Sequence, residues 1–356
     1  MRDSAALRSA RLFGLAWACG LLLTVVMVVM AVGWHLPVRD PDDTMLRFPA
    51  ILAAAIALDV IPRMIRRGEV RSVMAERWPA RHWAFALSGL GAWYLCYATF
   101  RNVKSMVPFV NHHRYDGRLA SIDRGIWGGN SPAHVLHQVL GTHLAAHVFS
   151  TVYIGWIALV PVSIAIALVW TRSTAAGSWY VTAVAVDWVL GAILYLLVPT
   201  LGPVYSAPRD FTMLPHTYVT DLVNSLLTDR HAVVADVWGS GTLQTIAAFP
   251  SLHVGIMTTI CLSVMLFRLK RWIQVVSWIF WVLTVFATLY IGWHFFCDII
   301  GGAAVGSFAV WISAMTTGNH VGLRPRLRPS ADELSDGPEE PPGRVDASGA
   351  RPAPLG

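Results

Sequence analysis

Residues 247–259, AAFPSLHVGIMTT, place Pro250, Ser251 and His253 at the start of an apolar run that continues to Phe267. Similar apolar runs recur along the chain. Of its 356 residues 55% are hydrophobic and only 13% are charged, and the mean hydropathy is +0.53. A soluble domain has about a quarter of its residues charged, so this composition predicts an integral membrane protein. The sixteen Trp and nine Tyr residues fit that class, because their rings favour the boundary between lipid and water.

Eight stretches are candidate membrane spans, because a helix needs about 20 apolar residues to cross about 30 Å of hydrocarbon. They run approximately over 12–36, 46–62, 82–100, 147–170, 179–199, 249–267, 272–291 and 294–315. The stretches 46–62 and 82–100 are the weakest, since the former is short and carries Asp59. The pattern predicts an all-α polytopic bundle with about eight transmembrane helices.

The basic residues indicate an orientation for this bundle. Most of them fall in cytoplasmic segments if both termini lie in the cytoplasm, as expected for a protein of the plasma (cytoplasmic) membrane. Five cations crowd one external segment instead: Arg101, Lys104, Arg114, Arg118 and Arg124. The stretch from about 115 to 146 has apolar residues at helical spacing and is expected to form an amphipathic helical segment along the outer surface.

The composition divides the chain into three regions. Residues 1–84 hold the first two predicted spans, 85–317 form the main membrane domain, and 318–356 form a predicted disordered cytoplasmic tail. From Pro325 onward the sequence is rich in Pro, Gly and charged residues and lacks apolar periodicity. The four cysteines lie in apolar runs without ligand spacing, so neither a disulfide framework nor a zinc site is indicated.

Polar side chains collect on the external side of the predicted bundle. Ser251 and His253 begin one span, and His294 and Asp298 begin another, four residues apart on one helix face. Three cations follow other spans at the same side: Arg101, Lys104 and Arg209. Several separate regions therefore deliver two histidines, an acid, a serine and positive charge to one side of the membrane.

This set suits phosphoryl transfer, in which a nucleophile attacks phosphorus, an acid protonates the leaving oxygen and fixed cations stabilise the equatorial oxygens. His294 is the candidate nucleophile, and Asp298 would fix the tautomer of its imidazole. His253 is the candidate general acid. Ser251 can cap its helix while the first N–H groups of that helix bind phosphate together with Arg101, Lys104 and Arg209. Neither a metal nor another cofactor is required.

These residues also carry a family resemblance. FPSLH (249–253) followed by HFFCD (294–298) resembles the second and third motifs of the type 2 phosphatidic acid phosphatase superfamily, Pro-Ser-Gly-His and Ser-Arg-x5-His-x3-Asp. The resemblance implies the same roles for His294, Asp298 and His253. It covers roughly residues 85–315.

The sequence departs from the family pattern in three places. Leu252 replaces the motif glycine, Ala287 and Thr288 occupy the Ser-Arg positions, and no Lys-x6-Arg-Pro precedes the site. The Leu at the glycine position and the missing arginine before His294, with FRNVKSMVPF (100–109) and YDGRLASIDRGIWGG (115–129), are similar to the inositol phosphorylceramide synthase (aureobasidin-resistance) branch. The resemblance implies an inositolphosphotransferase-like enzyme acting on a membrane lipid.

Other interpretations of single residues stay open. His253 could simply end a helix, the His294–Asp298 pair could be a structural hydrogen bond, and Arg101 and Lys104 could be interface anchors. Asp187, within the stretch 179–199, is expected to have a packing role. Four histidines could bind a metal but are expected to lie on the surface: His134, His137, His143 and His147.

The expected function is transfer of a phosphoryl-containing group from a lipid phosphoester or phosphodiester through a phosphohistidine, at an active site that faces the extracytoplasmic side. The partner is a membrane lipid and not a nucleic acid, and no oligomeric state is assigned. An alcohol acceptor makes the protein a transferase, and water makes it a polyprenyl phosphate or phosphatidic acid phosphatase. Two further alternatives are a lipid transporter that catalyses nothing and a vanadate-dependent haloperoxidase, against which the eight spans and the missing arginine argue.

Overall fold

The computed structural model describes residues 12–40, 44–67, 69–171 and 173–328. Within these ranges the chain forms thirteen α-helices, a π-helical segment, a 3-10 turn and one pair of two-residue strands. The expected all-α class is therefore confirmed for the described part of the chain.

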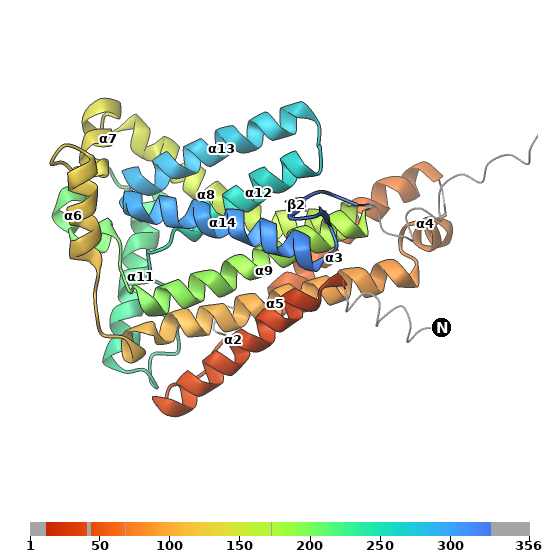
Figure 1. Cartoon of the computed structure of the whole chain (residues 1–356), viewed down its shortest axis with the longest axis horizontal. Helices are drawn as coiled ribbons and strands as arrows, with labels where there is room; N and C mark the ends of the chain where they lie inside the picture. The colour runs from red at the N-terminus through yellow and green to blue at the C-terminus, as the bar shows by residue number, and fades with distance from the viewer. Residues whose placement is uncertain (1–11, 41–43, 68, 172, 329–356) are drawn as a thin grey trace, which may run out of the picture.

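The long helices run side by side along the long axis of the molecule (Figure 1). They are α2 (Gly14–Gly33), α5 (Ala80–Val110), α8 (Leu144–Ala165), α9 (Thr174–Leu197), α12 (Leu252–Leu266), α13 (Arg271–Tyr290) and α14 (Phe296–Thr316). Helix α8 continues into the π-helical segment η1 (Ile166–Trp170). Helix α9 lies at the centre and packs against α2, α5, α12 and α14, while α12 also packs against α13.

Five helices among the described residues are long and apolar enough to cross a membrane: Gly14–Gly33, Leu144–Trp170, Thr174–Leu197, Arg271–Tyr290 and Phe296–Thr316. They coincide with five of the eight predicted spans. The other three predicted spans are helical as well, in α3 (Thr44–Arg67), α5 and α12. Helix α12 has only 15 residues, and α3 and α5 are not among the helices that meet the criterion within the described residues, so the count of eight is not confirmed.

Helix α4 (Val70–Arg77) is the next helix along the chain after α3. The two helices are joined by the carboxylate of Asp59, which lies 2.8 Å from guanidinium nitrogens of both Arg63 and Arg77. Asp59 is almost fully buried, and its charge is therefore neutralised by paired cations.

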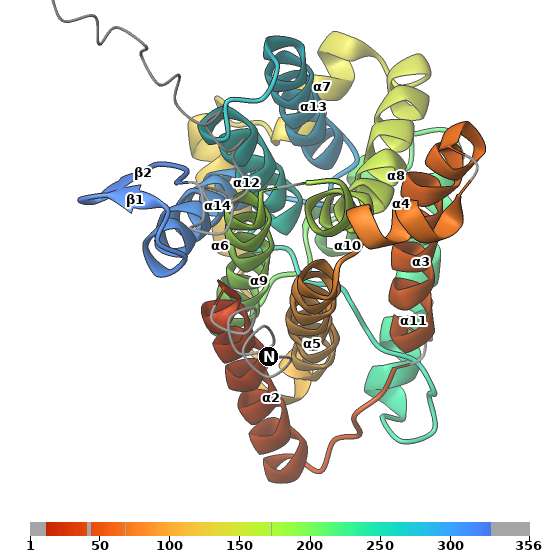
Figure 2. The same cartoon turned by 90° about the vertical axis from the view of Figure 1, so that its right-hand side faces the viewer.

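The shorter helices gather at one end of the bundle, on the left in Figure 1: α6 (Asp116–Ile126), α7 (Pro132–Leu140), α10 (Pro203–Ser206), the 3-10 turn η2 (Pro208–Phe211) and α11 (Tyr218–Ala235). Helices α6 and α7 account for most of the amphipathic segment predicted over 115–146. Helix α4 lies toward the opposite end, and Figure 2 shows it on the side of the bundle near α3 and α8.

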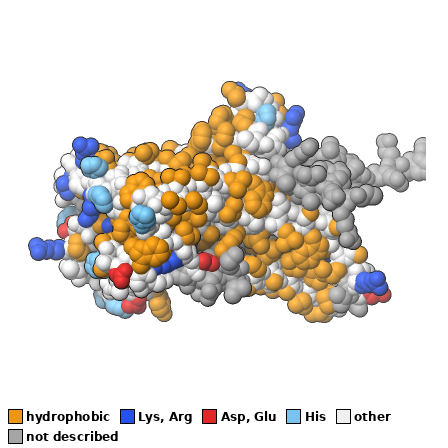
Figure 3. All heavy atoms as spheres, turned by 90° about the horizontal axis from the view of Figure 1, so that it is seen from below, with side chains coloured by type: hydrophobic (Ala, Val, Ile, Leu, Met, Phe, Trp, Pro, Cys, Tyr) orange, Lys and Arg blue, Asp and Glu red, His pale blue; other side chains and the backbone are white. Residues whose placement is uncertain are grey.

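The side of the bundle carries the apolar surface that membrane insertion requires. Figure 3 shows hydrophobic side chains over its middle, and most of the visible histidines and many charged side chains lie at the left end of the view. Residues such as Leu21, Val25 and Val29 of α2 are more than half exposed. In water such an extensive apolar surface would be unfavourable, whereas hydrocarbon covers it without cost.

The C-terminal region is ordered further than the sequence predicted. Residues 318–328, at the start of the expected disordered tail, form the hairpin β1 (His320–Val321) and β2 (Arg324–Pro325). The Nε1–H of Trp311 on α14 donates to the carbonyl of Leu323 and holds this hairpin against the bundle. Residues 329–356 lie outside the described residues, as do residues 1–11. The predicted boundary between residues 84 and 85 stays a prediction, and α5 runs across it.

Candidate active site

The three residues expected to carry chemistry come from the ends of two helices that pack together. His253 is the second residue of α12, His294 lies in the loop between α13 and α14, and Asp298 lies in the first turn of α14. These ends lie at the end of the bundle that also carries α6 and α7 (Figure 1).

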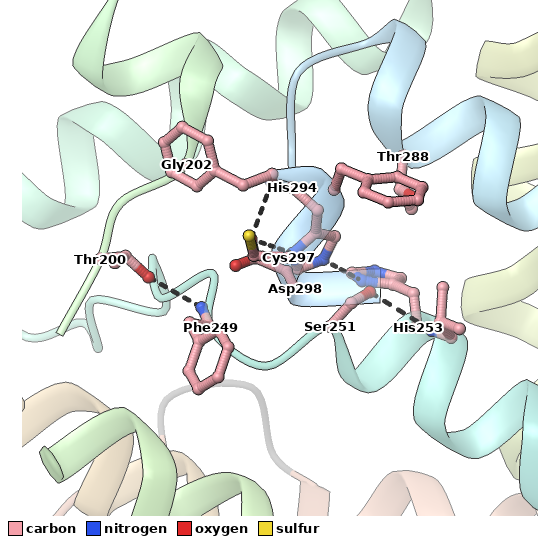
Figure 4. Close-up of polar contacts among 12 residues, drawn as sticks. Thr200, Gly202, Phe249, Ser251, His253, Thr288, His294, Cys297 and Asp298 are labelled. Atoms are coloured by element: carbon pink, nitrogen blue, oxygen red, sulfur yellow. Dashed lines mark hydrogen bonds and ion pairs between the residues drawn. The ribbon is translucent and has the colours of Figure 1, made fainter. Parts of the chain in front are cut away.

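The structure brings these side chains into one hydrogen-bonded row (Figure 4). The Nδ1 of His253 lies 3.0 Å from the Nε2 of His294, and the Nδ1 of His294 lies 3.3 Å from the Oδ2 of Asp298. Asp298 is fully buried and His294 is 4% exposed, so bulk water does not screen their interaction. A proton on the Nδ1 of His294 leaves its Nε2 lone pair free, and this lone pair faces the His253 ring.

Close packing of α12 on α14 sets the distance between the two histidines. A Cβ added to Gly302 would lie 2.2 Å from the Ser251 carbonyl oxygen, and one added to Gly306 would lie 2.2 Å from the Gly255 carbonyl oxygen. Only glycine allows the two backbones to approach so closely. The small residues of GGAAVGS (301–307) thus serve close helix packing.

Ser251 connects the two helices and is fully buried. Its hydroxyl accepts a hydrogen bond from the N–H of Val254 at 3.3 Å and so caps α12, as the sequence predicted. Its own N–H donates to the backbone carbonyl of Asp298 at 3.0 Å. The serine therefore fixes the start of α12 against the first turn of α14.

The loop that precedes α10 supports both helix starts. The backbone carbonyl of Thr200 accepts from the N–H of Ala248 at 3.0 Å, and its hydroxyl accepts from the N–H of Phe249 at 2.8 Å (Figure 4). Gly202 has a φ of +95°, and a Cβ at this position would lie 2.4 Å from the carbonyl oxygen of Trp293. Glycine is thus required where this loop passes the chain next to His294.

Aromatic side chains enclose His253, and nothing in the sequence pattern pointed to them. The ring centroid of Trp156 lies 4.3 Å and that of Tyr153 4.9 Å from the imidazole. The Nε1–H of Trp156 donates to the backbone carbonyl of His253, and Trp293 stacks on Tyr153 at 5.1 Å. These two residues of α8 restrict the orientations that the His253 ring can adopt.

The predicted cations lie in different environments. Lys104 is half-buried near the end of α5. Its Nζ lies 4.9 Å from the Tyr195 ring centroid, and its charge interacts electrostatically with His253. Arg101 lies one turn earlier, with its guanidinium 5.9 Å from the Tyr97 ring centroid. Arg209 is exposed in η2, and its chain neighbours Asp210 and Phe211 line a pocket that also includes His294.

A further cation lies beside His294. A small pocket, about 60 Å³ in volume, is lined by His294, Asp123, Arg124 and Asp210 among others. Arg124 is exposed on α6, and the sequence pattern marked it only as one of the crowded external cations. Burial raises the pKa of Asp123, while the backbone N–H groups of Phe296 and Cys297 lower it by donating to the carboxylate.

The remaining polar candidates have structural partners. His137 was expected at the surface, but it is buried. Its Nε2 lies 2.8 Å from the backbone carbonyl of Tyr290, so the buried ring has a hydrogen-bond partner. Asp187 accepts a hydrogen bond at 2.7 Å from the hydroxyl of Thr259, consistent with the packing role predicted for it. The described residues contain no group of three or more His, Cys, Asp or Glu side chains placed to hold a metal ion.

A protein-family model described as the PAP2 superfamily matches residues 118–312, which are more than half of the chain. The match begins within α6, ends within α14 and includes the two histidines and Asp298. No curated protein and no solved structure matches the chain significantly.

Proposed function

This chain belongs to the PAP2 superfamily, and from that premise we propose that it transfers a phosphoryl-containing group from a membrane lipid through a phosphohistidine at His294. The observation that carries the proposal is the row His253–His294–Asp298, with 3.0 Å between the facing ring nitrogens and a carboxylate behind the second ring.

The first step of the proposed reaction forms a P–N bond and breaks a P–O bond. The Nε2 lone pair of His294 attacks phosphorus, and the oxygen of the leaving alcohol takes the proton from the Nδ1 of His253. The substituted imidazole then carries a positive charge, which the carboxylate of Asp298 stabilises across the Nδ1–H. In the second step His253 removes a proton from the acceptor, whose oxygen attacks phosphorus and releases His294.

The short distance between the two histidines supports this division of roles. A proton on the Nδ1 of His253 points at the Nε2 of His294, so the proton donor and the lone pair already face each other. An entering phosphoryl group must separate the two rings and replace their hydrogen bond. The proton of His253 then points to the leaving oxygen, and the lone pair of His294 points to phosphorus.

Fixed positive charge for the phosphoryl oxygens would come from two separate helices. Lys104 on α5 interacts electrostatically with His253, and Arg124 on α6 lines the pocket that includes His294. We include Arg101 and Arg209 as further candidate cations, and the N–H groups at the start of α12, beside Ser251, as further donors. In this proposal Lys104 and Arg124 replace the arginine whose motif position Thr288 occupies.

We propose an alcohol as acceptor, in the manner of an inositolphosphotransferase, on the evidence of the sequence similarity. Hydrolysis is the second candidate, because the pocket beside His294 includes the exposed Arg124 and Asp210, so water can enter it. We further propose that the protein lies in the plasma (cytoplasmic) membrane with both termini in the cytoplasm, so that the site faces the extracytoplasmic side.

The test is incubation of the purified protein with polyprenyl phosphate, phosphatidylinositol or phosphatidic acid, followed by mass spectrometry. Phosphate release alone indicates a phosphatase, and transfer to an added alcohol indicates a transferase. The variants His294→Ala and His253→Ala are expected to abolish turnover. A protein that moves lipid, retains this activity in both variants and never carries covalent phosphate would be a transporter, contrary to the proposal.

A further inference from the structure

Helix α6 carries two buried aspartates on one face. Asp116 and Asp123 are seven residues, or about two turns, apart and are 6% and 1% exposed. Most of the other side chains of α6 are exposed, and only Leu119 is also buried in this helix. A buried carboxylate is costly unless it is paired or hydrogen-bonded, so the partners of these two indicate what the helix does.

Asp116 holds the loop that precedes α10. Its Oδ1 accepts from the backbone N–H groups of Leu201 at 2.8 Å and Gly202 at 3.0 Å. The adjacent Thr200 accepts in turn from the two residues that precede Pro250 and Ser251. Asp116 is therefore connected through one loop to the start of α12, where His253 lies.

Asp123 holds the start of α14 directly. Its Oδ2 accepts from the N–H of Phe296 at 2.7 Å, and its Oδ1 accepts from the N–H of Cys297 at 3.2 Å. These N–H groups lie between His294 and Asp298 in the chain. At a helix start they have no partner within the helix, and a carboxylate also interacts favourably with the helix dipole there.

We propose that Asp116 and Asp123 are positioning residues, through which α6 holds the two halves of the active site at the separation that attack by His294 and protonation by His253 require. This inference rests on the proposed function. Asp116 acts on the half that carries the general acid, and Asp123 acts on the half that carries the nucleophile. The two carboxylates together accept four backbone hydrogen bonds, two from the loop before α10 and two from the start of α14, which are far apart in sequence.

The rival explanation is that α6 only stabilises the fold. The two explanations differ in the steps that they affect. A loss of folded protein lowers the measured rate of every step by the same factor. Displacement of one half of the site instead lowers the rate of the step in which that half acts.

The experiment compares Asp116→Ala and Asp123→Ala with a control variant, Asp221→Ala. Asp221 lies on α11, and its replacement removes an exposed partner of His216. Hydrogen exchange of the full-length protein is measured over 199–202 and 295–297, together with phosphoenzyme formation and the dependence of turnover on the leaving group. Asp123→Ala should accelerate exchange at 295–297 and slow phosphoenzyme formation, each at least about tenfold. Asp116→Ala should accelerate exchange at 199–202 and slow turnover mainly for substrates with a poor leaving group. Asp221→Ala should change none of these.

Unchanged exchange in both segments would overturn the positioning role, as would equal losses in all steps that match the loss of folded protein. The corresponding Asn variants, which keep one acceptor oxygen, should lie between the Ala variants and the original protein. If the unmodified protein forms no phosphoenzyme and His294→Ala is fully active, the proposed function fails. The exchange data still decide in that case whether α6 holds the two loops.

Discussion

Replacing Gly302 by alanine should separate the two helices that carry the histidines. The added Cβ would lie 2.2 Å from the carbonyl oxygen of Ser251, and such carbons are essentially never found within 3.0 Å of another heavy atom. The helices must therefore move apart by about 0.8 Å or distort locally. The contacting atom belongs to the backbone and cannot rotate away.

The displacement lies close to the residues of the proposed active site. Ser251 is two residues from His253, and Gly302 lies one helical turn after Asp298. A misplacement of about 1 Å of reacting groups costs on the order of 10²-fold in rate, so we expect a similar loss of kcat in Gly302→Ala. Initial rates with the preferred lipid phosphate, normalised to folded protein, measure this loss.

Two other glycines provide matched controls. Gly306→Ala creates the same 2.2 Å contact, with the carbonyl of Gly255, but one turn farther from the histidines. It should destabilise the protein similarly and lower kcat less than Gly302→Ala does. A Cβ added to Gly155 on α8 has no atom within 4 Å, so Gly155→Ala should cause neither loss of stability nor loss of kcat. Full activity in Gly302→Ala, or equal losses of kcat in Gly302→Ala and Gly306→Ala, would refute the argument that this contact sets the geometry of the site.

Three further variants test single contacts. His253→Gln should lower turnover of alkyl phosphates by about 10²–10⁴-fold but affect a nitrophenyl ester far less, because that leaving group needs no proton; equal losses would contradict the role of acid. Asp59→Asn should destabilise the protein by about 3 kcal/mol without changing kcat, because two arginines lose their buried partner, and an unchanged melting temperature would contradict this. Burial holds the pKa of His137 below its usual value, so the unfolded chain binds the proton at higher pH. Stability should therefore fall as the pH drops below about 6.5, and thermal unfolding at two pH values should show a smaller fall in His137→Gln.

Local features of the site could be predicted from the sequence. His294 and Asp298 are four residues apart near a helix start, so helical geometry alone places them together. Ser251 precedes an apolar run and is of a residue type that caps helices, which predicted its contact with the N–H of Val254. The meeting of His253 with His294 spans 41 residues; the predicted sidedness placed both histidines on one side of the membrane, and the family resemblance implied matching roles for them.

Contacts between loops could not be predicted in this way. Asp116 and Asp123 bind backbone N–H groups, and any residue type except proline can supply such a donor, so no pattern at residues 201–202 or 296–297 reveals the partner. The weak hydropathy of α5 has a related cause. This helix packs against α2 and α9 and needs less apolar surface than a helix that faces lipid, so composition alone separates it poorly from a soluble helix.

Thr288 on α13 occupies the position of the motif arginine, and this determines where the positive charge of the site must come from. Thr288 is fully buried, its hydroxyl donates to carbonyls of its own helix, and its carbonyl accepts from the N–H groups of Trp293 and His294. Thr288 carries no charge, so cations that bind the phosphoryl oxygens must reach them from other elements. Lys104 on α5 interacts electrostatically with His253, and Arg124 on α6 lines the pocket that includes His294. Because Arg124 is exposed on the same helix that holds both loops, displacement of α6 would alter the site geometry and remove a cation together. In the proposed mechanism α6 therefore determines both the alignment of the histidines and the charge that faces the substrate.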